Sequence, residues 1–261
     1  MPVLDAILAA TRATLPDLRR RGAELERAAL SRGVPADFEA ALRQDFVALI
    51  AEVKRRSPSA GDINPGLDPV ALAESYARGG AAAVSVLTDG PFFGGALADL
   101  EAVADAVSVP LLRKDFILDE VQLLEARASG ASAALLIVRA LDQGALARLL
   151  HFAGELGLAT LVETHTAAEI DAAISAGARV IGVNSRDLDN FTIDRDAAWR
   201  LLEKVPADLI AVAESGMATR ADVESAAAAG ADAVLIGSAL AAAGEPETSA
   251  RGVSAVRRRD R

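Results

Sequence analysis

Charged side chains stand at the ends of two short apolar runs in this sequence. Residues 47–54 begin as a buried strand would and end with Glu52 and Lys54, whereas residues 109–115 carry Lys114 near their end. Because successive side chains of a strand alternate between its two faces, Glu52 and Lys54 share one face. An ammonium and a carboxylate that face the same space supply a proton donor and a proton acceptor, the two groups that general acid–base catalysis requires.

Polar side chains also end two later apolar runs. Glu163 and His165 share a face of one run, and Asn184 and Arg186 share a face of the next. Because a buried charge without a partner is costly, side chains that gather in this way need either mutual ion pairing or a charged ligand. We favour a ligand site over structural ion pairing, because the polar residues recur at the same end of successive runs. The residues placed in one cavity by this argument are Glu52, Lys54, Lys114, Glu163, Asn184 and Arg186.

Eight apolar runs alternate with segments of helical periodicity, and several of these segments end in glycine. Each interval has the length of one strand, one helix and two short loops. The pattern predicts an α/β fold, a closed (β/α)8 TIM barrel. An open doubly wound sheet is the alternative, and the absence of a G-x-G-x-x-G turn after the first run argues weakly against it. The runs are 47–54, 82–89, 109–115, 133–138, 159–165, 180–187, 209–216 and 233–240.

The chain divides into an N-terminal helical extension, residues 1–46, and a catalytic barrel, residues 47–261, within one structural domain overall. We expect the helices of the extension to cover the lower end or the side of the barrel. A lid over the upper end is the alternative. The sequence leaves the oligomeric state open, with a monomer favoured.

The composition limits the class of partner. A net charge of −10 over 261 residues argues against general nucleic-acid binding, which needs a surplus of lysine and arginine. There is no apolar run long enough to span a membrane and no secretory signal pattern, so we expect a cytoplasmic protein without a membrane partner. Cysteine is absent and histidine occurs twice, so we expect neither disulfides nor a metal site.

The last two runs of the barrel end in small residues. In a (β/α)8 barrel the loops after the final two strands commonly bind phosphate through backbone N–H groups, and glycine lets the backbone approach the anion. We therefore predict a phosphorylated small-molecule substrate. Glu214 is out of phase with Ser215, which leaves the direction of its side chain open. The predicted phosphate-binding residues are Ser215, Gly216, Gly237 and Ser238.

Seven segments together resemble the indole-3-glycerol-phosphate synthase family of tryptophan biosynthesis: "LIAEVKRRSPSAGDI", "VSVLTDGPFFGG", "LLRKDFI", "LVETH", "IGVNSRDL", "AESGM" and "VLIGS". The resemblance implies a (β/α)8 barrel that closes the indole ring of 1-(2-carboxyphenylamino)-1-deoxyribulose 5-phosphate. Such an enzyme is a carboxy-lyase that releases carbon dioxide and water without a cofactor or metal. The family often has lysine where this chain has Ala60, and the extension follows the family pattern loosely.

The resemblance also implies roles for individual residues. Lys114 is the general acid that protonates the substrate carbonyl, and Glu163 is its acid/base partner in the dehydration. Lys54 binds the carboxylate, Glu52 orients Lys54, and Asn184 joins this catalytic group. We also expect the two lysines to lower each other's pKa. The residues expected to bind the substrate, with the two phenylalanines flanking its aromatic ring, are Ser57, Phe93, Phe116, Arg186 and Glu214.

Two other functions compete with this interpretation. A related phosphate-binding barrel isomerase, such as phosphoribosylanthranilate isomerase, shares the phosphate end but is not expected to carry the "AEVKRRSPS" and "LRKDF" segments. A non-catalytic barrel that senses a phosphorylated metabolite would bind its ligand without turnover. His165 stays open between a cavity role and a structural one, and His151 is expected to be structural.

Overall fold

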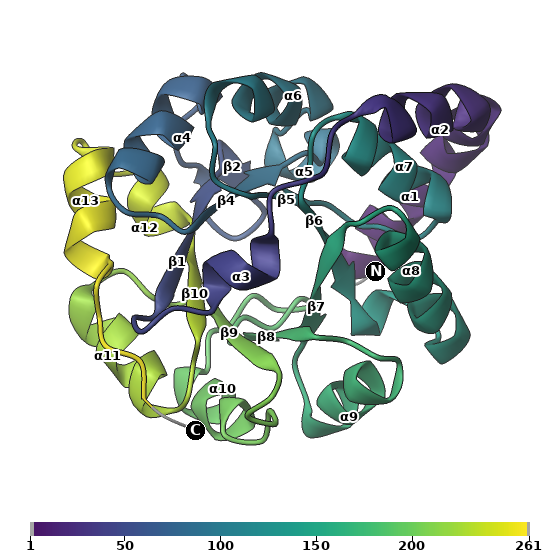
Figure 1. The fold of residues 1–261 in the computed structure, drawn as a ribbon. Coiled ribbons are helices and arrows are strands. Elements are labelled where there is room, and N and C mark those ends of the chain that lie inside the picture. Colours follow the sequence, from purple (N-terminus) through teal and green to yellow (C-terminus); the bar gives the residue numbers. More distant parts are fainter. Residues whose placement is uncertain (1–2, 260–261) are drawn as a thin grey trace.

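The computed structural model describes residues 3–259, and its centre is a closed barrel of eight parallel strands (Figure 1). Around the barrel the strands follow the order β1-β10-β9-β8-β7-β6-β5-β4, and β4 pairs with β1 to close the ring. The (β/α)8 prediction is therefore confirmed. The strands are β1 (Ala48–Val53), β4 (Ala83–Leu87), β5 (Leu111–Lys114), β6 (Ala133–Ile137), β7 (Ala159–Thr164), β8 (Val180–Asn184), β9 (Ile210–Glu214) and β10 (Ala233–Ile236).

Each predicted apolar run contains one strand, and the strand ends before the run does. The clearest difference is the last run, where β10 ends at Ile236 and the short helix α12 (Ser238–Ala241) follows at once. Gly237 is the N-cap residue of α12, so the backbone leaves the sheet there. The polar ends of these runs thus lie where the strands pass into loops at the upper end of the barrel.

Helices surround the barrel on its outside (Figure 1). Several of them begin at an aspartate or threonine whose side chain accepts a hydrogen bond from a backbone N–H of the first turn, which favours helix initiation at that residue. The helices that follow the strands are α4 (Pro69–Arg78), α6 (Leu97–Ala106), α7 (Glu120–Ala128), α8 (Gln143–Glu155), α9 (Ala167–Ser175), α10 (Arg195–Leu202), α11 (Arg220–Ala228) and α13 (Pro246–Val253).

Short elements lie at the upper end of the barrel, where the strands end. A hairpin of β2 (Arg56–Ser57) and β3 (Gly61–Asp62) follows β1, and the short helix α5 (Gly90–Phe93) follows β4. The 3-10 turn η1 (Val138–Ala140) follows β6. The sequence does not predict these elements, because each is too short to show a period.

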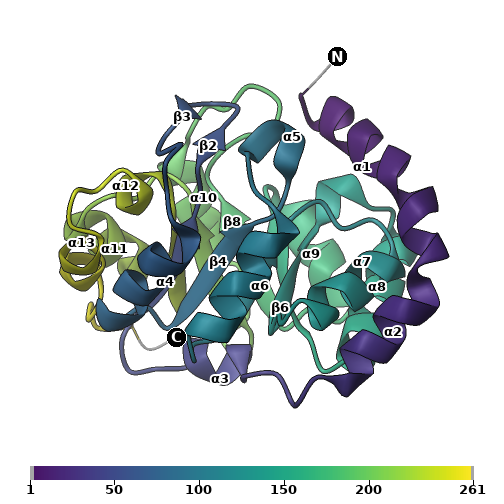
Figure 2. The same ribbon diagram turned by 90° about the horizontal axis from the view of Figure 1, so that it is seen from above.

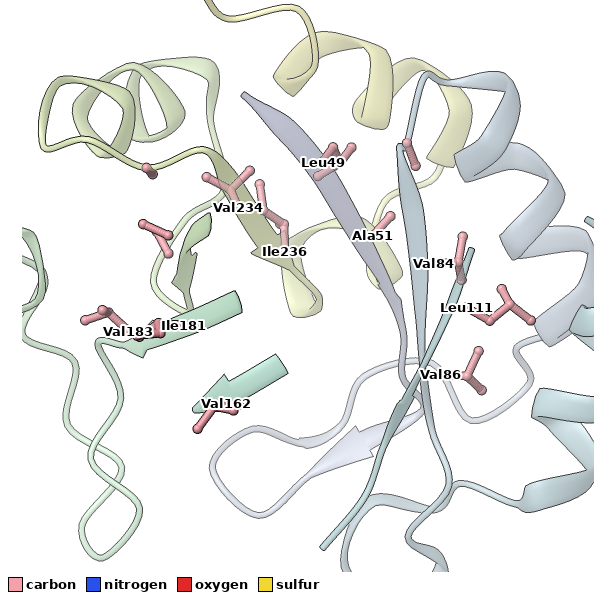
Figure 3. Packing of buried hydrophobic residues seen from close by; sticks show 14 of the residues in the cluster. Leu49, Ala51, Val84, Val86, Leu111, Val162, Ile181, Val183, Val234 and Ile236 are labelled. Atoms are coloured by element: carbon pink, nitrogen blue, oxygen red, sulfur yellow. The ribbon is translucent and has the colours of Figure 1, made fainter. Parts of the chain in front are cut away.

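The core has two layers that follow the alternation of the strands. Outward side chains such as Leu49, Val84 and Ile181 pack between the barrel and its helices (Figure 3). Inward side chains such as Ile50 and Leu161 fill the barrel interior. The interior is therefore packed in its lower part, which leaves the upper end for polar groups.

The helices before β1 occupy three places around the barrel. α2 (Gly22–Ser31) packs along α7 on the side, and α3 (Phe38–Leu42) lies at the lower end, where it contacts β1 and β4 (Figure 2). α1 (Val3–Arg20) begins toward the same end as α5 and the hairpin (Figure 2). The extension thus combines the side and lower-end placements with an approach to the upper rim.

No helix within residues 3–259 is both long enough and apolar enough to span a lipid bilayer.

Candidate active site

A cavity of about 320 Å³ opens at the upper end of the barrel. This volume is in the range of small-molecule sites. Its walls come from the ends of the strands and from the loops that follow them. Every residue that the sequence analysis assigned to the site lines it: Glu52, Lys54, Ser57, Phe93, Lys114, Phe116, Glu163, Asn184, Arg186, Glu214, Ser215, Gly216, Gly237 and Ser238.

Lys114 lies between two carboxyl groups in this cavity. Its Nζ is 2.9 Å from Glu163 Oε2 and 3.3 Å from Glu214 Oε2. Burial alone would lower the pKa of the Lys114 ammonium, but the carboxylates of Glu163, Glu214 and Glu52 outweigh burial and raise it. The expectation that a second lysine lowers the pKa of Lys114 is wrong. Carboxylates surround Lys114, and Lys54 is itself paired with Glu52.

The two carboxyl groups that share Lys114 differ in ionisation. Burial raises the pKa of Glu214 to about 8. The nearby charge of Glu163 also raises this pKa, whereas the Lys114 ammonium lowers it. Burial would also raise the pKa of Glu163, but Lys114, His165 and the Asn184 amide lower it to about 2. At neutral pH the site therefore contains an ammonium, a carboxylate at Glu163 and a largely protonated Glu214.

Two inward glycines make room for the carboxyl groups of Glu214 and Glu52. The side chain of Glu214, whose direction the sequence left open, points into the barrel against Gly182 of β8, where a Cβ would overlap Glu214 Oε1. A Cβ at Gly237 would overlap the Glu52 carboxylate and come within 2.9 Å of Lys54 Nζ. Sequence reasoning missed Gly182, although it alternates in phase with Asn184 and so faces inward.

The turn after β9 has an unusual backbone. Ser215 and Gly216 both have positive φ, 66° and 73°. A Cβ at Gly216 would also approach Ile193 Cγ2 to 2.8 Å, so glycine is required there both by the backbone conformation and by space. This turn lies beside Gly237 and Ser238 on the wall of the cavity.

Aromatic and polar side chains complete the walls. The rings of Phe93 and Phe116 lie with centroids 6.1 Å apart and an interplanar angle of 37°. The Ser57 hydroxyl accepts a hydrogen bond from the Ala60 N–H at 3.2 Å, and Arg186 Nη1 donates to the Phe191 carbonyl at 3.2 Å. Apolar lining residues that the sequence analysis did not name include Leu87, Leu135, Ile137, Leu188, Phe191 and Ile193.

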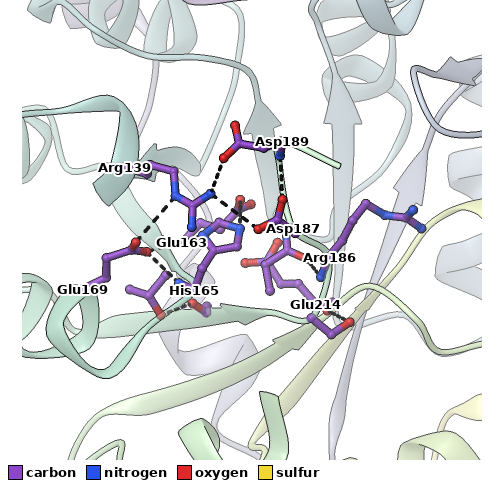
Figure 4. A network of polar contacts seen from close by, with 12 residues as sticks. Arg139, Glu163, His165, Glu169, Arg186, Asp187, Asp189 and Glu214 are labelled. Carbon is purple, nitrogen blue, oxygen red and sulfur yellow. Dashed lines mark hydrogen bonds and ion pairs between the residues drawn. The ribbon is translucent and has the colours of Figure 1, made fainter. Parts of the chain in front are cut away.

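His165 shares a strand face with Glu163, yet it is not among the lining residues. Its side chain is buried behind Glu163, in a group of charged residues outside the cavity (Figure 4). His151 is exposed on α8 and pairs with Glu155. Within residues 3–259, no cluster of three or more histidine, aspartate or glutamate side chains is arranged to hold a metal ion.

Comparison with known proteins identifies the family. A family model described as indole-3-glycerol phosphate synthase matches residues 4–253. This chain belongs to the indole-3-glycerol phosphate synthase family. The indole-3-glycerol phosphate synthase of Mycobacterium ulcerans is 49% identical over 252 residues, covering 95% of this chain and 92% of the relative. The protein of the same name from Mycobacterium tuberculosis is 47% identical over 252 residues, with the same coverage of 95% and 92%.

Solved structures of other barrels share the fold of this indole-3-glycerol phosphate synthase family member. A 3-hexulose-6-phosphate synthase structure has a TM-score of 0.65 at 16% identity, covering 79% of this chain and 98% of its own. A thiamine phosphate pyrophosphorylase from Pyrococcus furiosus has a TM-score of 0.59 at 15% identity, covering 81% and 95%. At these identities the likeness concerns the fold alone.

Proposed function

We propose that this family member closes the indole ring of 1-(2-carboxyphenylamino)-1-deoxyribulose 5-phosphate, with release of carbon dioxide and water. One observation of the site supports the proposal most: the buried Lys114 ammonium lies between two carboxyl groups in a cavity that also contains the turns after β9 and β10. Such a cavity suits a substrate with a reacting carbonyl, an aromatic carboxylate and a phosphate. The activity is that of a carboxy-lyase, because the ring carboxylate leaves as carbon dioxide.

Ring closure is the step that needs an acid. The aromatic carbon forms a bond to the carbonyl carbon, and negative charge develops on the carbonyl oxygen. Lys114 gives a proton to this oxygen, so its N–H bond breaks as the new O–H bond forms. The raised pKa of Lys114 keeps it protonated at neutral pH. A positioned acid of this kind contributes about 10²- to 10⁴-fold in rate.

Dehydration needs a base as well as an acid. After carbon dioxide has left, the hydroxyl takes up a proton and departs as water, and the neighbouring position loses a proton to form the indole. The one proton that the loss of carbon dioxide consumes overall comes from the solvent. Glu163 is the proton acceptor, because its low pKa keeps it as a carboxylate. Its Oε2 is 2.9 Å from Lys114 Nζ, so a proton can pass between the two groups and restore the starting state.

The remaining residues hold the substrate. Lys54, oriented by its ion pair with Glu52, binds the ring carboxylate, and Phe93 and Phe116 flank the aromatic ring. A neutral Glu214 can donate a hydrogen bond to the substrate without adding a second negative charge. The polar groups of the substrate contact Ser57, Asn184 and Arg186, and the phosphate lies against Ser215, Gly216, Gly237 and Ser238.

Replacing the proposed acid tests the function. Lys114→Met removes the ammonium but keeps a side chain of similar length, and we expect formation of indole-3-glycerol phosphate to fall by about 10²-fold or more. Lys204→Met is the matched control, because Lys204 is exposed on the outside of the barrel. Product formation by Lys114→Met at the rate of Lys204→Met would contradict the acid assignment. Tight substrate binding by the unmodified protein without any product would instead support a sensor.

A further inference from the structure

A group of charged residues connects Glu163 to the outside of the barrel (Figure 4). His165 is the central member, and its side chain is only 5% exposed. The proposed chemistry does not use it, since it does not line the cavity. We call this group the His165 network, and its members are Arg139, Glu163, His165, Glu169, Asp187 and Asp189.

His165 faces the oxygen of Glu163 that Lys114 does not contact. Lys114 Nζ lies 2.9 Å from Glu163 Oε2, and His165 Nε2 lies 3.6 Å from Glu163 Oε1. The carboxylate is therefore held between two nitrogen groups, one inside the cavity and one behind it. A rotation of the carboxyl group away from Lys114 would lose both contacts.

The imidazole is itself held from the far side. His165 Nδ1 lies 3.4 Å from Glu169 Oε2 at the start of α9, and the same oxygen accepts a hydrogen bond from the His165 backbone N–H at 2.7 Å. Arg139 of η1 fixes Glu169 in turn, with Nε 3.7 Å from Oε1. Because the backbone N–H and the ring of His165 both contact this one oxygen, the imidazole has little freedom to turn.

The charges around the ring favour its protonated form. Burial alone would lower the pKa of His165, but Glu169 and Glu163 outweigh burial and raise it, against a smaller opposing effect of Arg139. Asp187 also faces the group, from the loop after β8. A protonated ring places a positive charge between the two carboxylates, which lie at ion-pair distances of 3.6 Å and 3.4 Å from its nitrogens rather than in hydrogen bonds.

We propose that His165 is a positioning residue for Glu163: its imidazole, held by Glu169 and Arg139, fixes the Glu163 carboxylate against Lys114. The catalytic part of this inference rests on the proposed function, because Glu163 is the proposed base. The inference goes further by assigning a role to three residues outside the cavity, His165, Glu169 and Arg139. Their positions in the turn after β7, on α9 and on η1 couple the base to the outer layer of the barrel.

Enzyme kinetics test the positioning role. In His165→Gln we expect kcat to fall at least tenfold while KM changes less than threefold, since the substrate does not touch the residue. The acid limb of the kcat profile should move to higher pH, because Glu163 loses a cation that lowers its pKa. In Glu169→Gln we expect a smaller fall of kcat and a smaller movement of the acid limb to higher pH. Thr160→Val, a buried change at the start of β7, is the control for loss of packing.

Three kinetic results would overturn the proposal. One is a kcat profile of His165→Gln that coincides with that of Thr160→Val. Another is a loss of kcat without movement of the acid limb, which would mean a structural role only. The third is a raised KM at unchanged kcat, which would place His165 in substrate binding.

An NMR titration tests the same coupling without substrate. The chain has two histidines, and the exposed His151 provides the internal reference. We expect Glu163→Gln to lower the pKa of the His165 ring, and an unchanged His165 titration would overturn the inference. If the coupling is present but the unmodified protein forms no product, the proposed function fails instead. The two failures are thus distinguishable.

Discussion

At the scale of single residues, the site depends on one ammonium shared by two buried carboxyl groups. Two carboxylates this close to each other cannot both be ionised at low cost, so their pKa values move apart. Of these two carboxyl groups His165 faces only Glu163, and together with Lys114 and Asn184 it lowers the pKa of Glu163, whereas burial raises the pKa of Glu214. Glu163 is then suited to accept a proton and Glu214 to donate a hydrogen bond.

Removal of each carboxylate in turn should give different results. Glu214→Gln resembles the protonated form that burial favours below about pH 8, so we expect activity at pH 7 to stay within about tenfold of the unmodified protein. Glu163→Gln removes the proposed base and should cost about 10²- to 10⁴-fold in kcat.

The pH profile provides a second comparison. The Glu214 carboxyl group is protonated below its raised pKa and loses its proton as the pH rises through about 8. Any change of kcat near pH 8 that comes from Glu214 should therefore be absent in Glu214→Gln. Equal losses of kcat in the two variants at pH 7 would contradict the assignment of different charges.

At the scale of elements, the strands position the polar groups by alternation, and glycine on one strand leaves space for a carboxyl group of the next. β8 and β9 are paired with Gly182 opposite Val212 and Asn184 opposite Glu214. The missing side chain at Gly182 leaves the volume that the Glu214 carboxyl group occupies. Asn184, one inward position later, completes the polar end of β8.

Gly182→Ala tests whether the position of Glu214 matters for activity in a protein that still folds. The new Cβ would overlap the end of the flexible Glu214 side chain rather than backbone, so we expect the protein to fold with a changed Glu214 position. The expected result is a kcat/KM lowered by about tenfold or more with an unchanged far-UV circular dichroism spectrum. Ala211→Gly, a change of similar size on the outward face of β9, is the control. Full activity of Gly182→Ala would show that the position of Glu214 is not critical.

At the scale of the whole molecule, the two ends of the barrel have different tasks. The upper end carries the cavity, whereas α3 closes the lower end with the buried side chains of Phe38 and Leu42. In (β/α)8 barrels the upper face is the usual place of the active site and the lower face serves stability. The helices before β1 thus contribute to the lower end of the interior core.

Leu42→Ala should therefore affect stability alone. Leu42 is fully buried, so its truncation should lower the free energy of unfolding by about 2–5 kcal/mol. Chemical denaturation measures this change, and kcat and KM at a temperature where the variant is folded should equal those of the unmodified protein. Leu30→Ala, at an exposed position of α2, is the control and should change little. A large loss of kcat in folded Leu42→Ala would contradict the division between the two ends.

The sequence predicted the barrel because its main determinants are local. Alternation of apolar runs with helical segments, together with the polar ends of the runs, was enough to place Glu52, Lys54 and Lys114 in one cavity. The same alternation fixes which side chains face inward, since a strand has a period of two residues. Short elements such as α5 and the β2–β3 hairpin were not predicted, because they contain too few residues to show a periodic pattern.

The sequence by itself thus determined the fold, the family resemblance and most of the polar residues that line the cavity. Only the tertiary structure decided how those residues are charged. The pKa of Lys114 rises because Glu163 and Glu214 meet it from strands that lie far apart in the chain. Burial and the distances between charges set each pKa, and both arise only when the barrel closes.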